Sequence, residues 1–146
     1  MANTHTQIEI ERWIRTQWMP KYFNQEFMAQ RLQLNTGGHF DFDAVSEDGS
    51  IVANISTSNA KTSGGKNGTA KYQKLRSDML FLTMVNARQK FIILSEKDMF
   101  DLCMKERENG RVPIEIEFAY AEIPESLNLS LKESKKIAAN EVTPKK

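Results

Sequence analysis

Residues 37–82 decide the fold, and they read GGHFDFDAVSEDGSIVANISTSNAKTSGGKNGTAKYQKLRSDMLFL. Hydrophobic and polar residues alternate over residues 39–44, which is the two-residue period of a half-buried strand. The pair Asp48-Gly49 follows, and Asp-Gly between two alternating runs is a strong signal for a β-hairpin. The return strand, residues 51–57, is rich in β-branched residues. The sequence therefore predicts a hairpin that carries two aspartates and is followed by a basic loop and a helix.

The chain after the hairpin alternates between helical and extended patterns. The predicted elements are a loop over 58–68, a helix over 69–85, a strand over 90–94, a helix over 95–106 capped by Ser95, and a strand over 113–121. The run at 90–94 is continuously apolar, which is typical of a central strand covered on both faces. Pro113 at the start of the last strand favours an edge position, because proline donates no hydrogen bond to a neighbouring strand.

The chain before the hairpin begins with a predicted helix. Thr6 is the expected N-cap, Glu9 completes a capping box, and Pro20 is expected to end the helix or to start a turn. Residues 27–34 fit either a strand or a helix. The strand is favoured because residues 35–38, Asn-Thr-Gly-Gly, then form a hairpin loop into the next strand.

The element order is therefore α, three strands in a meander, α, β, α, β. This mixed order predicts an α/β fold with a mixed β-sheet and flanking helices. The chain has 146 residues, the size of one domain. We expect a single domain over residues 1–124 and a polar C-terminal extension over 125–146 that is partly helical or disordered.

Composition excludes several classes of protein. The single cysteine, Cys103, cannot form an internal disulfide and has the setting of a buried helical thiol. The two histidines, His5 and His39, are too few and too scattered for a zinc site. No signal peptide or membrane-spanning stretch is visible, so we expect a cytoplasmic protein with no membrane partner. The net charge of +1 restricts any electrostatic argument to local features.

The αβββαβ order and the residues around Asp43 resemble the PD-(D/E)XK nuclease superfamily, which has the restriction-endonuclease-like fold. The resemblance covers roughly residues 6–121. It implies that Asp43 is the motif aspartate, which binds a metal ion. It places Asn54 where the second acid should be and Ser56 where the lysine should be. The acidic-x-lysine motif is therefore degenerate in this chain.

This departure from the family pattern has chemical consequences. Mg²⁺ or Mn²⁺ takes anionic oxygen ligands, and an amide at position 54 makes such binding weak or absent. Asp41, two residues from Asp43, is a candidate second ligand, and Glu9 or Glu11 on the first helix could approach. A migrated lysine, Lys61, Lys66, Lys71 or Lys74, could replace the missing ammonium group, which would orient water and neutralise developing charge.

Three of these residues keep a second interpretation. Asp43 is either a metal ligand or a solvated strand aspartate beside a turn, and for Asp41 alternation alone accounts for its position. His39 shares the face of these aspartates and could contact phosphate or metal, although a lone strand histidine is more often simply exposed.

A basic segment follows the hairpin. Between Gly49 and Ser77 there is no Asp or Glu. The basic residues in this interval are Lys61, Lys66, Lys71, Lys74 and Arg76. This is a candidate surface for the phosphates of nucleic acid, although an ordinary solvated loop and helix face explains the same pattern. Tyr72 could stack on a base or belong to the core.

Three functions follow as hypotheses. The first is a nuclease-fold protein that binds nucleic acid, DNA in preference to RNA, through the basic loop and helix, with impaired catalysis. The second is an active divalent-metal-dependent nuclease with a rearranged site. The third is a non-catalytic interaction or assembly domain, for which a homo-oligomer that buries Trp13 and Trp18 would be the supporting pattern.

Overall fold

The structure is a computed structural model that describes residues 4–61 and 69–127. Its elements in chain order are α1 (Thr4–Trp13), the π-helical turn η1 (Ile14–Trp18), α2 (Met19–Phe23), β1 (Phe27–Gln33), β2 (His39–Ser46), β3 (Ile51–Ser56), α3 (Thr69–Thr83), β4 (Gln89–Leu94), α4 (Lys97–Glu108) and β5 (Ile116–Tyr120). Lys66 and most of the predicted C-terminal extension lie outside the described residues.

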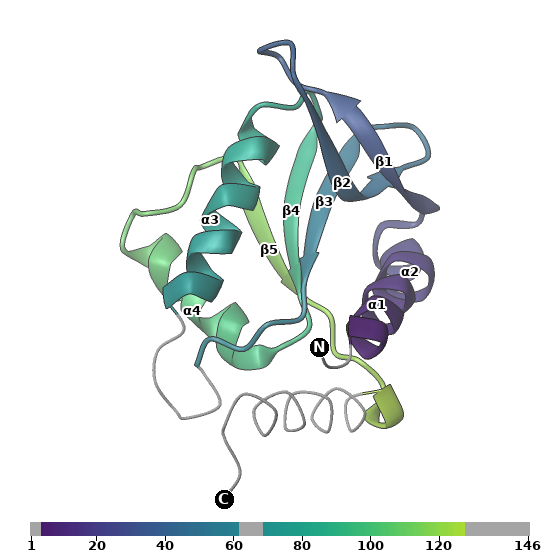
Figure 1. Ribbon diagram of the computed structural model, residues 1–146, viewed down its shortest axis with the longest axis vertical. Helices are drawn as coiled ribbons and strands as arrows, with labels where there is room; N and C mark the ends of the chain where they lie inside the picture. The colour runs from purple at the N-terminus through teal and green to yellow at the C-terminus, as the bar shows by residue number, and fades with distance from the viewer. Residues whose placement is uncertain (1–3, 62–68, 128–146) are drawn as a thin grey trace, which may run out of the picture.

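The strands form one five-stranded sheet in the order β1-β2-β3-β4-β5. β1, β2 and β3 are antiparallel neighbours, whereas β3, β4 and β5 run parallel. Helices α1 and α2 cover one face of the sheet, and α3 and α4 cover the other (Figure 1). The predicted α/β fold with a mixed sheet and flanking helices is confirmed, and residues 27–34 form a strand as favoured.

Two hydrophobic cores lie on opposite faces of the sheet. Toward α1 and α2, Ile10 and Ile14 pack with Ala53 and Ile93, and toward α3 and α4 the core includes Leu75 and Cys103. Four consecutive residues of β4, 91–94, are buried, which confirms that this strand is covered on both faces. β5 is an edge strand, also as predicted.

The N-terminal helix differs from the prediction at both ends. It begins before Thr6, which is buried within α1 and does not cap it. Pro20 does not end it, because the preceding turn widens: the Met19 N–H bonds to the Ile14 carbonyl, five residues back. This π turn places the proline in the first turn of α2, where a missing N–H is tolerated. The helix ends at Asn24, which adopts a left-handed conformation with φ of 60°.

Two other boundaries also need correction. Helix α4 begins at Lys97 with Glu96 in the N-cap position, and the Ser95 hydroxyl bonds to the Glu96 side chain instead of capping the helix. The last strand begins at Ile116 because a turn precedes it, closed by a 3.1 Å bond from the Ile116 N–H to the Pro113 carbonyl.

Candidate functional site

The site is built around an irregularity in β2. Phe42 pairs with Gln30 of β1, and Val45 pairs with Met28. Two residues of β2, Asp43 and Ala44, therefore lie opposite a single residue of β1. This pairing of two residues with one defines a β-bulge. A bulge redirects the side chains that it contains, and bulges are frequent beside active sites. Asp43 is one of the two residues that this bulge contains.

Next to the regular β2–β3 pairing, the side chains of Asp43 and Asn54 connect the two strands by hydrogen bonds to the backbone. The ladder between these strands covers Ala44 with Ala53 and Val45 with Val52. Next to it, the Asp43 N–H donates to Asn54 Oδ1 at 3.1 Å. The Ile55 N–H donates to Asp43 Oδ2 at 2.8 Å. Asn54 is 2% exposed, and its Nδ2 group has no hydrogen-bond partner among the described residues.

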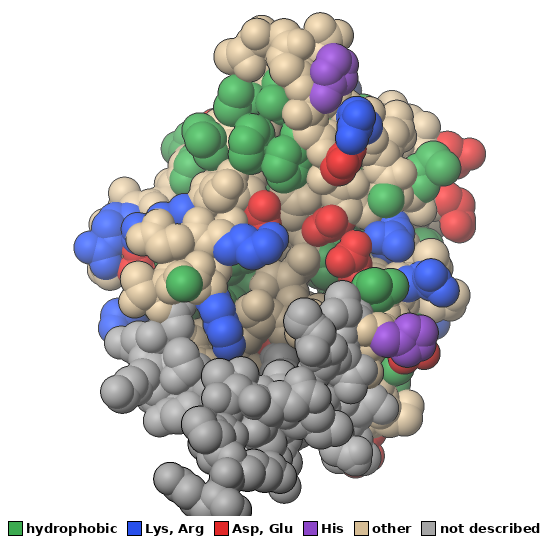
Figure 2. Space-filling view, in the orientation of Figure 1, with side chains coloured by type: hydrophobic (Ala, Val, Ile, Leu, Met, Phe, Trp, Pro, Cys, Tyr) green, Lys and Arg blue, Asp and Glu red, His purple; other side chains and the backbone are tan. Residues whose placement is uncertain are grey.

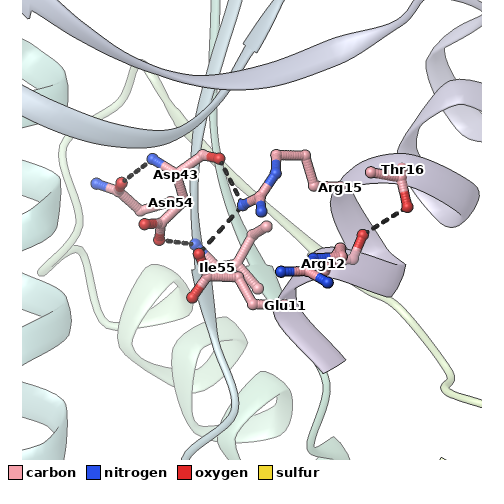
Figure 3. A network of polar contacts seen from close by, with 7 residues as sticks. All are labelled: Glu11, Arg12, Arg15, Thr16, Asp43, Asn54 and Ile55. Atoms are coloured by element: carbon pink, nitrogen blue, oxygen red, sulfur yellow. Dashed lines mark hydrogen bonds and ion pairs between the residues drawn. The ribbon is translucent and has the colours of Figure 1, made fainter. Parts of the chain in front are cut away.

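The N-terminal helix contributes a third group. Arg15, in the π turn, donates from Nη1 to the Asp43 carbonyl at 3.1 Å and to Glu11 Oε2 at 3.1 Å. Figure 3 shows Glu11 and Arg15 reaching from the helix toward Asp43 and Ile55 on the strands. Arg15 therefore ties the helix to the bulge and holds the Glu11 carboxylate beside it.

A pocket of about 250 Å³ opens next to this network, between the end of β3 and helix α3. Lys71 and Lys74 of α3 line it, as does Asp78 one turn farther along the helix. Glu11 lines it from α1, and Ser56 lines it at the end of β3. Figure 2 shows acidic side chains near the middle of this face, with lysine and arginine side chains close to them. The pocket thus combines cationic, acidic and hydroxyl groups.

Two carboxylates of this site are partly buried. Burial raises the pKa of Asp43 to about 6, opposed by the Ile55 hydrogen bond and aided by the charge of Glu11. Burial also raises the pKa of Asp78 to about 6, and the charge of Asp43 acts in the same direction. Lys74, whose Nζ lies 3.9 Å from Asp78 Oδ2, lowers the pKa of both carboxyls. Lys74 therefore places a cation near the two acids.

The residues present do not fit the metal site that the family resemblance implies. Across residues 4–61 and 69–127, no three acidic, histidine or cysteine side chains are grouped so that they could hold a metal ion. The Asn54 oxygen accepts from the Asp43 N–H, and one Asp43 oxygen accepts from Ile55. These atoms make hydrogen bonds between the two strands, and position 54, where the resemblance implies a second carboxylate, carries an amide.

The structure brings together some of the residues singled out in the sequence. Asp43 and Asn54 are in contact, while Ser56, Lys71 and Lys74 share the pocket. Asp41 does not join them, because both of its oxygens accept from Arg31, at 2.7 and 3.2 Å, on the exposed surface.

Other candidates lie elsewhere. Arg76 points to α4, where it pairs with Glu106 at 3.1 Å, and its guanidinium lies over the Tyr72 ring. Tyr72 itself is buried in the core, so it does not stack on a base. His39 and Lys61 are exposed, and neither lines the pocket. Cys103 is a buried helical thiol, as predicted, and burial raises its pKa to about 12.

Asp78 and Arg15 were not found from the sequence. A signal for Asp78 was present, because it lies four residues after Lys74 and seven after Lys71, which places all three on one face of a helix. Arg15 had no such signal, since its role depends on the π turn, which the sequence pattern does not predict.

No protein-family model matches the chain, and the searches of curated proteins and of solved structures also found no match. Within the residues that the structure describes, none of the helices has both the length and the apolar character needed to cross a bilayer.

Proposed function

We propose that this protein binds nucleic acid at the pocket between β3 and α3, and that its capacity for metal-dependent cleavage is impaired. The observation that carries the proposal is the meeting of Lys71 and Lys74 with Ser56 and Ser58 around one pocket. Ammonium and hydroxyl groups are the donors that proteins use for phosphate oxygens. The proposed family is the PD-(D/E)XK nuclease superfamily, supported by the element order and the position of Asp43 on β2.

Impaired cleavage follows from the atoms of the strand junction. Asn54 supplies no negative charge, and its oxygen is engaged by the Asp43 N–H. Position 56, where the family resemblance implies a lysine, is serine. Lys74 of α3 nevertheless places a positive charge near Asp43 and Asp78. A phosphate can therefore be attracted to the lysines, whereas the two carboxylates that a metal-dependent nuclease uses are not in place.

Neutralising the two lysines tests the binding proposal. In a Lys71→Gln/Lys74→Gln variant we expect affinity for a fluorescent DNA oligonucleotide to fall roughly tenfold, because two phosphate contacts are lost. The slope of log K against log salt should decrease by about 1.4 to 1.8, since each of the two contacts contributes about 0.7 to 0.9. Fluorescence anisotropy at several salt concentrations measures both quantities.

A matched control removes two cations at other places. Arg88 lies at the opposite end of β3, where its N–H bonds to the Ser50 carbonyl, and Lys105 is exposed on α4. An Arg88→Gln/Lys105→Gln variant should keep the affinity and the salt slope of the wild-type protein. Equal losses in both double variants would mean that binding follows total charge, and the pocket would not be the site.

A cleavage assay in Mg²⁺ and Mn²⁺ tests the other half of the proposal. The proposal predicts no cutting of single- or double-stranded DNA or RNA by the wild-type protein. Metal-dependent cutting that disappears in Asp43→Asn would instead establish an active nuclease with a rearranged site. If neither DNA nor RNA binds at low salt, the fold serves as an interaction or assembly domain.

A further inference from the structure

One face of α3 carries an aromatic side chain in addition to the charged side chains that line the pocket. Lys74, Asp78 and Phe81 are separated by four and three residues, so their side chains form one stripe along the helix. Lys74 and Phe81 lie about 10 Å apart along the helix axis. The stripe therefore runs from the pocket to an aromatic group near the other end of the helix.

Phe81 is part of an ordered aromatic stack. Its ring lies on that of Phe40 of β2, with 4.2 Å between the ring centroids and 14° between the ring planes. Phe40 in turn meets Phe42 edge to face at 4.8 Å. Phe42 is 1% exposed, whereas Phe40 and Phe81 are only half-buried. The contact with buried Phe42 thus connects two partly exposed rings at the surface to the core.

The surroundings of these two rings are apolar and open. Leu80, which directly precedes Phe81 in α3, is 57% exposed, and Leu32 lies opposite Phe40 in the β1–β2 pairing. Leu32 and Met84 are half-buried and pack against the same core cluster as the two rings. Figure 2 shows hydrophobic side chains gathered over the upper end of α3 and the adjoining strands, above acidic and basic side chains near the middle of the same face. We call Phe40, Phe81 and Leu80 the aromatic patch.

We propose that the aromatic patch stacks on a base of single-stranded nucleic acid whose phosphate lies at Lys71 and Lys74. This inference rests on the proposed function and names its substrate class. Aromatic side chains next to a basic groove are how proteins hold single strands without reading sequence. In a duplex the faces of the bases are already stacked on each other, so the patch selects unpaired nucleotides. Because Phe81 stacks on Phe40 and Phe40 packs on the buried Phe42, little side-chain freedom is lost on binding.

An abasic oligonucleotide separates the base from the phosphate. The probes are oligothymidylate of about 12 nucleotides, an abasic strand with the same number of phosphates, and a duplex of the same length. We expect the wild-type protein to bind oligothymidylate at least fivefold more tightly than the abasic strand. In Phe81→Leu this preference should largely disappear, whereas affinity for the abasic strand should not change.

Tyr22→Leu is the matched control. Tyr22 is 59% exposed on α2 and is stacked on Trp18, so the variant also removes an exposed aromatic ring from a stacked pair. It should keep the preference for bases over the abasic strand. Thermal unfolding followed by circular dichroism verifies that both variants are folded, and Phe81→Tyr, which keeps a ring, should retain the preference if Phe81→Leu unfolds.

The outcomes are distinct. If no probe binds, the proposed function fails. Equal binding of oligothymidylate and the abasic strand overturns the stacking inference while leaving phosphate binding in place. Tighter binding of the duplex than of the single strand also overturns it. A wild-type dimer in light scattering that becomes monomeric in Phe81→Leu would show that a second copy of the chain covers the aromatic patch.

Discussion

A protein that carries both Asp43→Asn and Asp78→Asn is expected to be more stable than the wild-type protein near pH 7.5, by about 2–4 kcal/mol in the free energy of unfolding. Burial is the main reason that both pKa values rise to about 6. Two such shifts correspond to at most ~6 kcal/mol, and partial exposure and mutual coupling reduce this figure. Asparagine removes the buried charge, and at position 43 its side-chain oxygen can still accept the Ile55 N–H.

The dependence on pH has a definite sign. A carboxyl whose pKa is higher in the folded state binds a proton more tightly there than in the unfolded chain. Asp43 and Asp78 therefore favour the folded state at low pH and lose that contribution as the pH rises from about 4 through about 6. The wild-type stability should decrease across this interval because of these two groups, and the double variant should lack this part of the decrease.

Urea unfolding at a series of pH values, in the presence of EDTA, measures the effect. Asp48→Asn is a control of opposite sign, because hydrogen bonds from the Ser50 hydroxyl and N–H lower the pKa of Asp48 to about 2. That variant should be less stable than the wild-type protein near pH 7.5. A double Asp43/Asp78 variant no more stable than the wild-type protein would contradict the charge strain that we attribute to this site.

The raised pKa values of Asp43 and Asp78 are relevant to function. The fold retains two carboxylates that oppose its stability, together with a lysine close enough to act on both. Groups with perturbed pKa values beside a pocket are concentrated at functional sites, because substrate binding and catalysis need charges that the core would exclude.

Regular patterns in the sequence were sufficient for the fold. Alternation over residues 39–44, the Asp48-Gly49 turn and the apolar run at 90–94 predicted their strands and turn correctly. The prediction for Pro20 is wrong because it assumes a regular α-helix, which a proline ends. The π turn that accommodates Pro20 has no simple sequence period, so the sequence pattern does not indicate it.

The site was less predictable for a related reason. The bulge at Asp43 and Ala44 is a break in alternation, and alternation is the pattern that predicted the strand. Asp41 was paired with Asp43 on that pattern, but its partner is Arg31, on the neighbouring strand. Asp78 required the helical spacing from Lys74 to be combined with the position of β3, and only the folded chain provides that combination.

Placing an acid at position 54, where the family resemblance implies one, with Asn54→Asp is expected to lower the free energy of unfolding by about 3–5 kcal/mol near pH 7.5 when no divalent metal is present. Position 54 is 2% exposed, and its side chain is bonded to the backbone of Asp43, whose carboxyl already has a raised pKa. A second carboxylate here would be a buried charge with no cation bonded to it. Because its pKa must rise, the loss should diminish as the pH is lowered toward 5.

Asn54→Ala separates charge from packing. It removes the oxygen that accepts the Asp43 N–H and leaves a small cavity, so its loss of stability should be nearly the same at every pH. Urea unfolding of both variants between about pH 5 and 8 makes the comparison. Equal pH dependence in the two variants would show that charge at position 54 is not the cause.

Millimolar Mn²⁺ then tests whether the charge at position 54 decides metal binding. The Asn54→Asp variant has the two carboxylates that the family resemblance implies, so Mn²⁺ should raise its midpoint of thermal unfolding through binding to the folded state. The wild-type protein, whose Asn54 oxygen is engaged by the Asp43 N–H, should show no such increase. If Mn²⁺ stabilised both proteins equally, the amide would not be the obstacle, and the wild-type site would have to be regarded as a competent metal site.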